Sequence, residues 1–292
     1  MLDDVQVWID GALVSADRAV VSVFDRGFLY GDSVFETVRT YGRRVFAVDK
    51  HLERLAESAR RVLIQIPVPL ADLKKELLAA AEASPHAESY LRLMVTRGVG
   101  SLGIDPSSAT RPLRVILVAP LVPPPPLDYE AGIAAASFTS GRHTDAVEVA
   151  GAKIGNYLVA VLAAERARAV GAKESFIVDG AGRVAEGATS NIFWVEGTSA
   201  ARLWTPPIDA GILAGITRAH VLLVAKELGI ECDYRLPRLT ELQQADEVFI
   251  SSSIREILPV VRIDEQPIGS GKPGRVTKQL LAAFRRAVTT ST

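Results

Sequence analysis

The sequence predicts a two-domain protein of mixed α/β class. Its 292 residues are long for a single hydrophobic core and suit two domains or one large α/β unit. Strand-like and helix-like patterns alternate along the chain, and four consecutive prolines interrupt them at 123–126. Because proline cannot occupy the interior of a helix or sheet, we expect a stiff, extended connector there. The predicted ranges are 1–117 for a small N-terminal α/β domain, 118–127 for the linker and 128–292 for a larger C-terminal domain.

The N-terminal range combines strands with two amphipathic helices. Helical spacing over 49–63 places Leu52, Leu55, Ala59 and Leu63 on one face. The other elements predicted here are a hairpin over 5–24 around a DG pair, a strand pair over 27–48, a helix over 70–83, and strands over 89–98 and 113–120.

The C-terminal range alternates between the two kinds of element more regularly. Gly171 ends an apolar helical stretch, because glycine commonly stops a helix. The predicted elements are a strand over 132–139, a helix over 154–171, three short strands over 174–195, a helix over 215–229, a strand–turn–strand over 246–264 and a closing helix over 274–288.

Composition excludes several classes of function. The formal net charge is −1, from 33 basic and 34 acidic residues, so no broad basic field predicts nucleic-acid or membrane binding. No stretch of about 18 uncharged apolar residues predicts a transmembrane helix, and the acidic start of the chain does not resemble a signal peptide. The single cysteine, Cys232, fits a reducing compartment and an ordinary packed position in a strand. We therefore expect a cytoplasmic protein. The four histidines show no ligand spacing, so no metal site is predicted.

Lys153 stands out in the segment GAKIGNYLVA (151–160). Small residues surround it, which suggests a crowded position with clearance for something flat. An amine that is partly removed from water has a lowered pKa and can attack a carbonyl group. The alternative is a solvated lysine at the start of a helix, which is the commoner situation for lysine.

Further features match the needs of one cofactor. Glu186 follows an apolar stretch, where a carboxylate needs a cationic or proton-donating partner. Residues 215–217 stand where a helix begins, and free amides there favour an anion. Serines at 251–253 and the cation of Arg54 would add to a phosphate site. Each has a plain alternative: a turn glutamate, an N-cap threonine at 217, a serine-rich turn and a surface arginine. An amine, a carboxylate and a phosphate site are together what pyridoxal 5′-phosphate requires.

At these residues the chain resembles the fold-type IV pyridoxal-phosphate enzymes, the class IV aminotransferases. The resemblance covers almost the whole length. The segments that carry it are KIGNYL (153–158), EGATSNIF (186–193), LAGITR (213–218) and DEVFISSSIREILPV (246–260). It implies a small N-terminal domain, a larger C-terminal domain with a barrel-like sheet, and the cofactor at their interface. It also implies a homodimer in which a loop of the neighbour reaches the pocket.

The resemblance assigns roles to individual residues. Lys153 would hold the cofactor as a Schiff base and shuttle a proton during catalysis. Glu186 would pair with the pyridine nitrogen, Tyr157 would bond the ring hydroxyl, and Leu213 would pack on the ring. The phosphate would be held by Arg54, Ile216, Thr217 and Ser253.

The subgroup within the family is a separate question. NYL after the lysine and the strand SYLRLMVTRG resemble the branched-chain aminotransferases, which predicts ping-pong transfer between a branched-chain L-amino acid and a 2-oxo acid such as 2-oxoglutarate. The substrate-binding residues implied are Tyr30, Phe35, Tyr90, Arg92, Ser253 and Ile254.

Three alternatives stay open. A D-amino acid or (R)-amine transaminase has the same fold, although the loop after residue 96 lacks the Arg-x-His pair of the D-amino acid enzymes. A 4-amino-4-deoxychorismate lyase is favoured by SSSIREILPV, in which Ile254 and Arg255 would narrow or recharge the pocket, and by Thr37, which stands where the branched-chain pattern has glycine. A non-enzymatic protein of this fold is disfavoured, because the lysine, glutamate and phosphate-site residues are all present.

Overall fold

The computed structural model describes residues 4–140, 149–197 and 201–290. The chain forms two compact units. The N-terminal unit contains the described residues up to Val122 together with the segment Ala152–Asn156. The C-terminal unit contains the described residues of 123–151 and those from Tyr157 onward. Each unit is described by itself.

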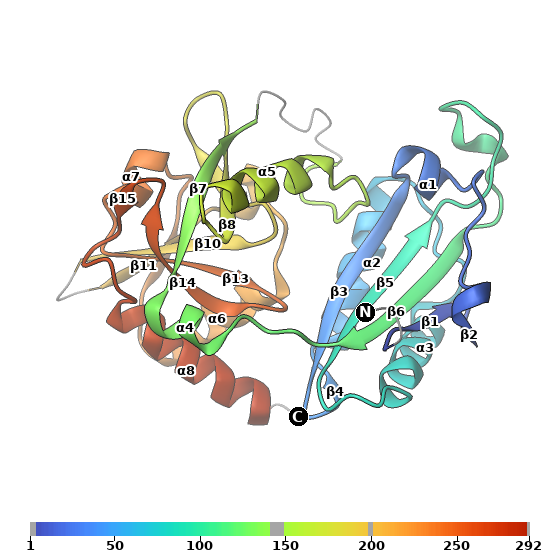
Figure 1. Ribbon diagram of the computed structural model, residues 1–292, viewed down its shortest axis with the longest axis horizontal. Helices are drawn as coiled ribbons and strands as arrows, with labels where there is room; N and C mark the ends of the chain where they lie inside the picture. Colours follow the sequence, from blue (N-terminus) through green and yellow to red (C-terminus); the bar gives the residue numbers. More distant parts are fainter. Residues whose placement is uncertain (1–3, 141–148, 198–200, 291–292) are drawn as a thin grey trace. The chain divides into compact units, whose positions relative to one another are not determined.

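The N-terminal unit is a sheet covered on one face by helices (Figure 1). Among the described residues, six strands pair in the order β2-β1-β6-β5-β3-β4, and every pairing is antiparallel. The elements are β1 (Gln6–Ile9), β2 (Ala12–Val14), η1 (Ala16–Arg18), α1 (Arg26–Tyr30), β3 (Ser33–Tyr41), β4 (Arg44–Val45), α2 (Val48–Arg61), α3 (Leu70–Glu82), β5 (Ser89–Thr96), η2 (Pro106–Ser108) and β6 (Leu113–Pro120).

Alternation along the strands decides which face of this sheet is covered. Side chains of a strand point alternately to opposite faces. Val34 and Val38 of β3 therefore face α2 and α3, and they pack with Leu52 and Leu55 in the core. Leu63 does not join this face as predicted. Helix α2 ends at Arg61, Leu63 adopts a left-handed φ of 56°, and its side chain is 82% exposed.

The C-terminal unit contains a larger sheet of mixed direction. Among its described residues the strand order is β12-β11-β10-β13-β14-β7-β8-β9, with β15 paired to β14. The elements are α4 (Pro126–Ala131), β7 (Ile133–Thr139), α5 (Leu158–Ala169), β8 (Glu174–Val178), β9 (Val184–Gly187), β10 (Asn191–Glu196), β11 (Arg202–Thr205), η3 (Ile208–Ala210), α6 (Ile216–Glu227), β12 (Cys232–Tyr234), α7 (Leu239–Gln243), β13 (Glu247–Ser252), β14 (Glu256–Ile263), β15 (Gln266–Pro267) and α8 (Arg275–Thr290).

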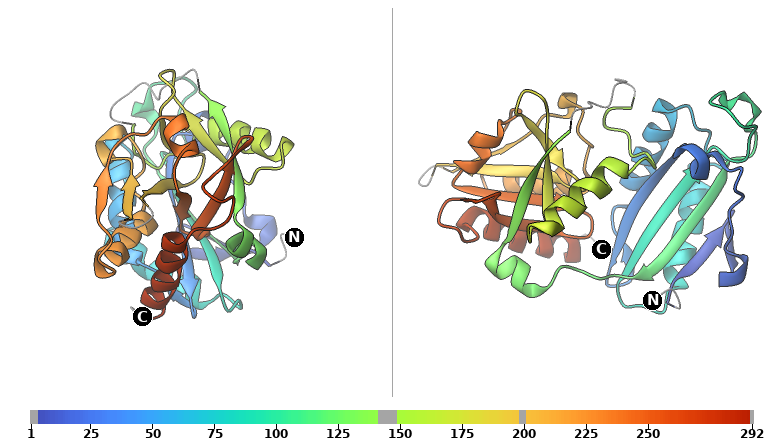
Figure 2. Two further views of the ribbon diagram at one scale, coloured as in Figure 1. Left: turned by 90° about the vertical axis from the view of Figure 1, so that its left-hand side faces the viewer. Right: turned by 45° about the horizontal axis from the view of Figure 1, so that its top comes forward.

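The connections of this sheet require it to curl. Strands β9 and β10 are joined by only residues 188–190, yet β13, β14, β7 and β8 lie between them in the strand order. A flat sheet would hold the two strands far apart, since neighbouring strands are about 4.8 Å apart. The curl is visible in Figure 1 and in the turned views of Figure 2. Helices α6 and α8 pack together against β13 and β14, and α5 packs against β7 and β8. The curled sheet agrees with the barrel-like sheet predicted for this part of the chain.

The segment around Lys153 departs from the predicted helix over 154–171. Helix α5 begins only at Leu158. Ile154 instead forms an antiparallel bridge with Val34, and the amide of Gly155 donates to the carbonyl of Ser33 at 2.8 Å. These bonds hold residues 152–156 in an extended conformation along β3, which places them in the N-terminal unit although 128–292 was predicted to form one domain.

The proline-rich connector is shorter than the predicted range 118–127. Strand β6 continues to Pro120, and α4 begins at Pro126. Proline is tolerated at the first position of a helix, because the amide at that position has no intrahelical acceptor. In the part of the chain that the structure describes, no helix is long and apolar enough to cross a membrane.

Candidate active site

Lys153 is held firmly by its backbone. Its carbonyl accepts a hydrogen bond from the amide of Phe35 at 3.0 Å, and its amide donates to Ser58 Oγ at 3.0 Å. A Cβ at Gly155 would lie 2.1 Å from Ser33 Oγ. The absence of a side chain at 155 therefore lets the segment approach β3 closely, and the clearance for a flat ring that the sequence suggested stays a prediction.

The side chain of Lys153 lies over an aromatic ring. Its Nζ is 4.5 Å from the centroid of the Phe35 ring, and the guanidinium carbon of Arg92 is 3.9 Å from the same centroid. The Phe35 side chain is buried, whereas Arg92 and Tyr90 are half-buried. The structure thus brings together Lys153 and two of the predicted substrate residues, Phe35 and Arg92.

Strand pairing explains why these residues share one face of the sheet. In the register of β3 with β5, Phe35 is opposite Met94, Thr37 is opposite Arg92, and Arg39 is opposite Tyr90. Directly opposite residues of an antiparallel pair point to the same side. Tyr90, Arg92 and Phe35 therefore line the sheet face opposite to the one that α2 and α3 cover.

Tyr30, the remaining substrate residue predicted in this unit, has a different environment. Its hydroxyl accepts a hydrogen bond from the amide of Gly103 at 2.9 Å. Arg26 holds the same loop by donating to the carbonyls of Gly103 and Ile104 at 2.9 and 3.0 Å. Tyr30 is thus tied to the loop that follows β5.

Arg54, predicted to hold phosphate, forms a buried ion pair. Its Nε and Nη2 donate to the two carboxylate oxygens of Glu36 at 2.8 and 2.6 Å. The alternative of a surface arginine is wrong, because only 11% of this side chain is exposed. One edge of the guanidinium is committed to Glu36, which fixes the orientation of the whole group.

Glu36 and His51 belong to this cluster, and the sequence did not reveal them. His51 Nδ1 lies 2.7 Å from Glu36 Oε2. Burial opposes ionisation of Glu36, but the charge of Arg54 and the hydrogen bonds from Arg54 and His51 outweigh it and hold the pKa of Glu36 at about 2. Burial lowers the pKa of His51 against the pull of Glu36, so its ring is neutral at pH 7. Because a carboxylate can only accept, the proton between them lies on Nδ1.

Glu186 has its own setting in the C-terminal unit. It lies on β9 and is half-buried, and its Oε2 accepts from the amide of Leu213 at 3.1 Å. The carbonyl of Leu213 accepts from Asn191 Nδ2 at 2.9 Å. The turn before α6 is thereby fixed between Glu186 and Asn191, and Asn191 is a second residue that the sequence did not reveal.

Helix α6 begins in a way that suits an anion. Gly215 is its N-cap residue, and no described side chain caps the helix. A Cβ at Gly215 would lie 1.9 Å from Asn191 Oδ1, so only glycine fits there. Thr217 stands within the first turn and is buried, so the alternative of an N-cap threonine is wrong. The amides of the first turn of a helix have no intrahelical acceptor and attract anions.

Ser253 and Ile254 lie in the turn between β13 and β14, and both are half-buried. The neighbouring Arg255 does not recharge this turn as the lyase alternative suggested, because its Nη2 donates to Glu174 Oε2 at 2.8 Å. Tyr157 is the N-cap residue of α5 and the first residue of the C-terminal unit after the lysine segment. The predicted cofactor residues are thus divided between the units, with Lys153 and Arg54 in the N-terminal one.

The family of the chain follows from comparison with known proteins. A model of the amino-transferase class IV family matches residues 33–263, a range that includes Lys153 and Glu186. The chain therefore belongs to the class IV aminotransferases, a family of transaminases that depend on pyridoxal phosphate. This confirms the predicted family, fold and type of enzyme.

Individual relatives resemble the chain over nearly its whole length. A putative branched-chain-amino-acid aminotransferase of Methanocaldococcus jannaschii is 39% identical over 280 residues, which are 96% of this chain and 95% of the relative. A D-alanine aminotransferase of Bacillus licheniformis is 30% identical over 98% of each chain. The solved structure of a branched-chain aminotransferase from the archaeon Thermoproteus uzoniensis with norvaline has a TM-score of 0.88 and 30% identity, over 98% of this chain and 95% of that one.

Proposed function

We propose that this protein binds pyridoxal 5′-phosphate covalently at Lys153 and transfers amino groups between branched-chain L-amino acids and 2-oxoglutarate. The observation that carries the proposal is the grouping of the Lys153 amine with Phe35 and Arg92 on one sheet face. A buried ring next to the reactive amine suits an apolar side chain of the substrate. A cation on the same ring suits a carboxylate.

The donor chemistry of the described residues fits the cofactor. An amine on an apolar surface suits the aldehyde, a carboxylate suits the ring nitrogen, and a helix start without a capping side chain suits the phosphate. When bound, pyridoxal phosphate supplies a ring that withdraws electrons from the substrate. The proposal assigns cofactor contacts to residues of both units.

Each predicted residue then has one task. Lys153 would hold the aldehyde carbon covalently, and its amine would move the proton at the substrate Cα. Glu186 keeps the ring nitrogen protonated, and its orientation comes from the amide of Leu213. Tyr157 bonds the ring hydroxyl and Leu213 packs on the ring. The phosphate contacts proposed are Arg54, Ile216, Thr217 and Ser253.

Arg92 supports an acidic acceptor. Its Nε donates only weakly, to Met94 Sδ at 3.3 Å, and among the described residues it has no carboxylate partner. A half-buried guanidinium without a counter-ion is stabilised by an incoming carboxylate. We therefore assign Arg92 to the distal carboxylate of 2-oxoglutarate, while amides near Ser253 and Ile254 and the Tyr30 and Tyr90 hydroxyls complete the substrate contacts.

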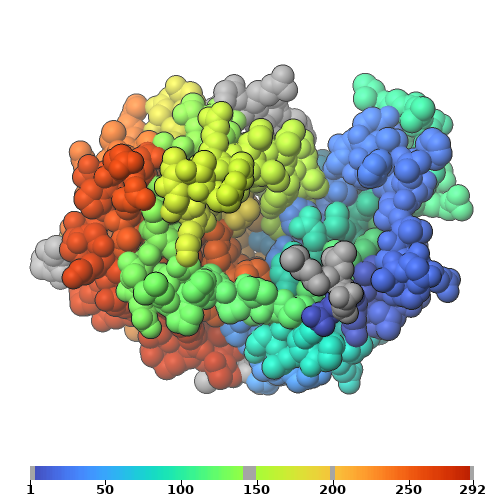
Figure 3. Space-filling model, viewed as in Figure 1, coloured from blue at the N-terminus to red at the C-terminus, as the bar shows by residue number. Residues whose placement is uncertain are grey.

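We also propose that the protein is a homodimer. Helix α1 and the loop that follows β5 lie side by side at one end of the N-terminal unit (Figure 3). Arg26 of α1 joins them by donating to the carbonyls of Gly103 and Ile104. Phe28, Leu102 and Ile104 are 70%, 73% and 88% exposed. Apolar surface of this kind marks protein interfaces. Light scattering on the purified protein should give twice the mass of the chain, and a monomeric mass at micromolar concentration would refute the dimer.

We also propose that the protein is cytoplasmic, because its single cysteine fits a reducing compartment.

The substrate is tested by colour. The purified protein should be yellow with bound cofactor, and the colour should bleach when the amino group of the true donor is transferred. L-leucine, D-alanine and (R)-1-phenylethylamine are added separately. Bleaching by L-leucine supports the proposal, whereas bleaching by only one of the others assigns the alternative transaminase. No bleaching, with release of 4-aminobenzoate from aminodeoxychorismate, identifies the lyase.

Lys153→Ala tests the covalent role. The variant should lose the visible band and at least about a thousandfold in turnover, because no other amine takes the place of the nucleophile. Ser58→Ala is the matched control, since it removes only the hydrogen bond to the Lys153 amide. A Lys153→Ala protein that keeps its turnover would overturn the proposed function.

A further inference from the structure

The turn that carries Ser253 and Ile254 is fastened by the residue that follows them. Ser252 and Glu256 pair across the base of the turn. The amide and the Nε of Arg255 both lie 3.3 Å from Ser252 Oγ and donate to it. The Arg255 side chain therefore lies back along the turn, and its guanidinium extends toward β8.

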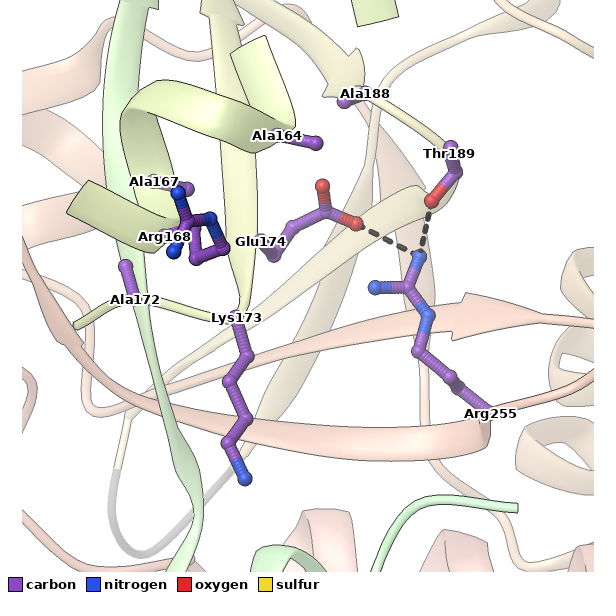
Figure 4. Close-up of a pocket in the computed structure, with 9 residues that line it drawn as sticks. All are labelled: Ala164, Ala167, Arg168, Ala172, Lys173, Glu174, Ala188, Thr189 and Arg255. Atoms are coloured by element: carbon purple, nitrogen blue, oxygen red, sulfur yellow. Dashed lines mark hydrogen bonds and ion pairs between the residues drawn. The ribbon is translucent and has the colours of Figure 1, made fainter. Parts of the chain in front are cut away.

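One carboxylate receives this guanidinium and several other donors. Arg255 Nη2 donates to Glu174 Oε2 at 2.8 Å and to Thr189 Oγ1 at 2.7 Å, as Figure 4 shows. Ser190 Oγ donates to the same Glu174 oxygen at 2.6 Å. The other oxygen accepts from the amide of Ser175 at 2.8 Å. Glu174 thus links β8, the loop 188–190 and the turn between β13 and β14.

The loop 188–190 continues directly from the strand that carries Glu186. A Cβ at Gly187 would lie 2.4 Å from Ser190 Oγ and 3.0 Å from the carboxyl carbon of Glu174. The amide of Gly187 also donates to the carbonyl of Ser190 at 2.8 Å. Because the loop closes so tightly around Glu174, the position of this carboxylate helps to set where the strand of Glu186 ends.

Among the described residues around this cluster, no other cation is free to replace Arg255. The cluster borders a cavity of about 340 Å³ whose wall includes Ala164 and Ala167 of α5. Two other cations line the cavity, but Lys173 pairs with Asp128 and Arg168 pairs with Glu165. Only 3% of the Glu174 side chain and 18% of the Arg255 side chain are exposed, so the pair is largely shielded from water.

We propose that Arg255 is a positioning residue for cofactor binding. Its ion pair with Glu174 holds the turn of Ser253 and Ile254 to the loop that follows Glu186, so that both are in place before the cofactor arrives. The inference rests on the proposed function and deepens it. Arg255 then meets neither phosphate nor substrate, and its effect passes through Glu174.

The test measures the affinity of the apoprotein for pyridoxal phosphate, by absorbance titration, together with the melting temperature. Arg255→Met and Glu174→Gln should each weaken cofactor binding on the order of tenfold, because each releases the turn from the loop. The double variant should regain melting temperature relative to Arg255→Met, since no unpaired carboxylate stays buried. It should not regain affinity. Arg168→Met, which changes a cation of the same cavity, should match the wild type.

Two results would overturn the inference. Wild-type affinity in the double variant would make the pair a matter of stability alone. Weak binding in Arg255→Met with wild-type binding in Glu174→Gln would make Arg255 a direct ligand of the phosphate. If Arg255→Met fails to fold, Thr189→Val removes one bond without stranding a charge and should weaken binding about threefold. A wild-type protein that takes up no cofactor at all would instead refute the proposed function.

Discussion

Glu36 in the N-terminal unit and Glu174 in the C-terminal unit each form an ion pair with an arginine. The two pairs differ in the secondary-structure elements that carry them. Glu36 lies on β3 and receives two nitrogens of Arg54, from α2, and the ring of His51. Glu174 receives a single nitrogen of Arg255, from a turn, and shares it with a hydroxyl. The first cluster joins a strand to a helix, whereas the second joins a strand to a loop and a turn. The arginines therefore differ in how much of the fold depends on them.

The largest effect expected from removing either carboxylate is on the free energy of unfolding. Glu36→Gln leaves the buried Arg54 without its counter-ion and should lower the free energy of unfolding by about 3–5 kcal/mol. Glu174→Gln removes the charge that faces a single nitrogen of Arg255 and should cost about 1–2 kcal/mol. Denaturant titrations of both variants and the wild type measure the difference. Equal losses would show that the two clusters are alike.

The loss of stability at low pH tests the contribution of the Glu36 cluster separately. A glutamate ordinarily has a pKa near 4.5, and folding lowers that of Glu36 to about 2. The unfolded chain thus binds the proton more readily, so the stabilisation is complete above about pH 5 and is lost as the pH falls toward 2. Glu36→Gln should flatten this loss. The control is Glu57, whose pKa the hydrogen bonds of Arg60 and Arg61 also lower to about 2. Because 43% of the Glu57 side chain is exposed and water screens its charge, Glu57→Gln should change the acid profile far less.

In the C-terminal unit the next largest effect is kinetic. Glu186→Gln removes the partner of the protonated ring nitrogen and should slow the chemical step about a hundredfold, while cofactor affinity changes much less. Stopped-flow decay of the visible band gives the step, and titration of the apoprotein gives the affinity. Unchanged turnover would contradict the role of Glu186.

Arg92 extends the comparison to an arginine that has no carboxylate partner among the residues the structure describes. Arg92→Met keeps the length and the packing on Phe35 but removes the charge. The KM for 2-oxoglutarate should rise roughly tenfold, whereas that for an apolar 2-oxo acid, 4-methyl-2-oxopentanoate, should stay within about twofold. Equal changes for both acceptors would place the distal carboxylate elsewhere.

The smallest effect belongs to Cys232. Burial raises the pKa of its thiol to about 11, so almost no reactive thiolate exists at pH 8. Cys232→Ala should leave turnover within about twofold of the wild type. Incubation with iodoacetamide should inactivate neither protein, and rapid inactivation of the wild type alone would assign the thiol a function.

The periodicity of apolar residues correctly predicted helices and strands whose pattern is contained within one continuous segment. The core face of α2 through Leu52, Leu55 and Ala59 is one case, and the three strands over 174–195 are another. The prediction that Leu63 lies on this face was wrong, because the helix ends before its apolar pattern does. The prediction of a helix over 154–157 was wrong, because the hydrogen bonds of this segment go to β3, more than 100 positions earlier in the chain.

The candidate site was predictable where residues lie within short segments. Lys153, Glu186 and residues 213–217 belong to such segments. Glu36, His51 and Asn191 were not predictable in the same way, because their partners come together only when a strand meets a helix or a turn meets a strand. The alternation of β3 does place Glu36 on the covered face between Val34 and Val38, where an ionised group requires a partner. That rule was the available signal.

The strand-like attachment of residues 152–156 has a consequence for the protein as two pieces. The chain enters the C-terminal unit at Pro123, returns to the N-terminal unit for five residues, and leaves again at Tyr157. A fragment ending at Val122 would keep Arg54 and Arg92 but would lack the reactive amine. The complementary fragment would carry Lys153 without the strand that orders it. Two fragments produced by splitting the gene at the proline run should therefore be inactive separately and regain activity only when mixed. In the mixture, the lysine segment of the C-terminal fragment would pair with β3 of the N-terminal fragment.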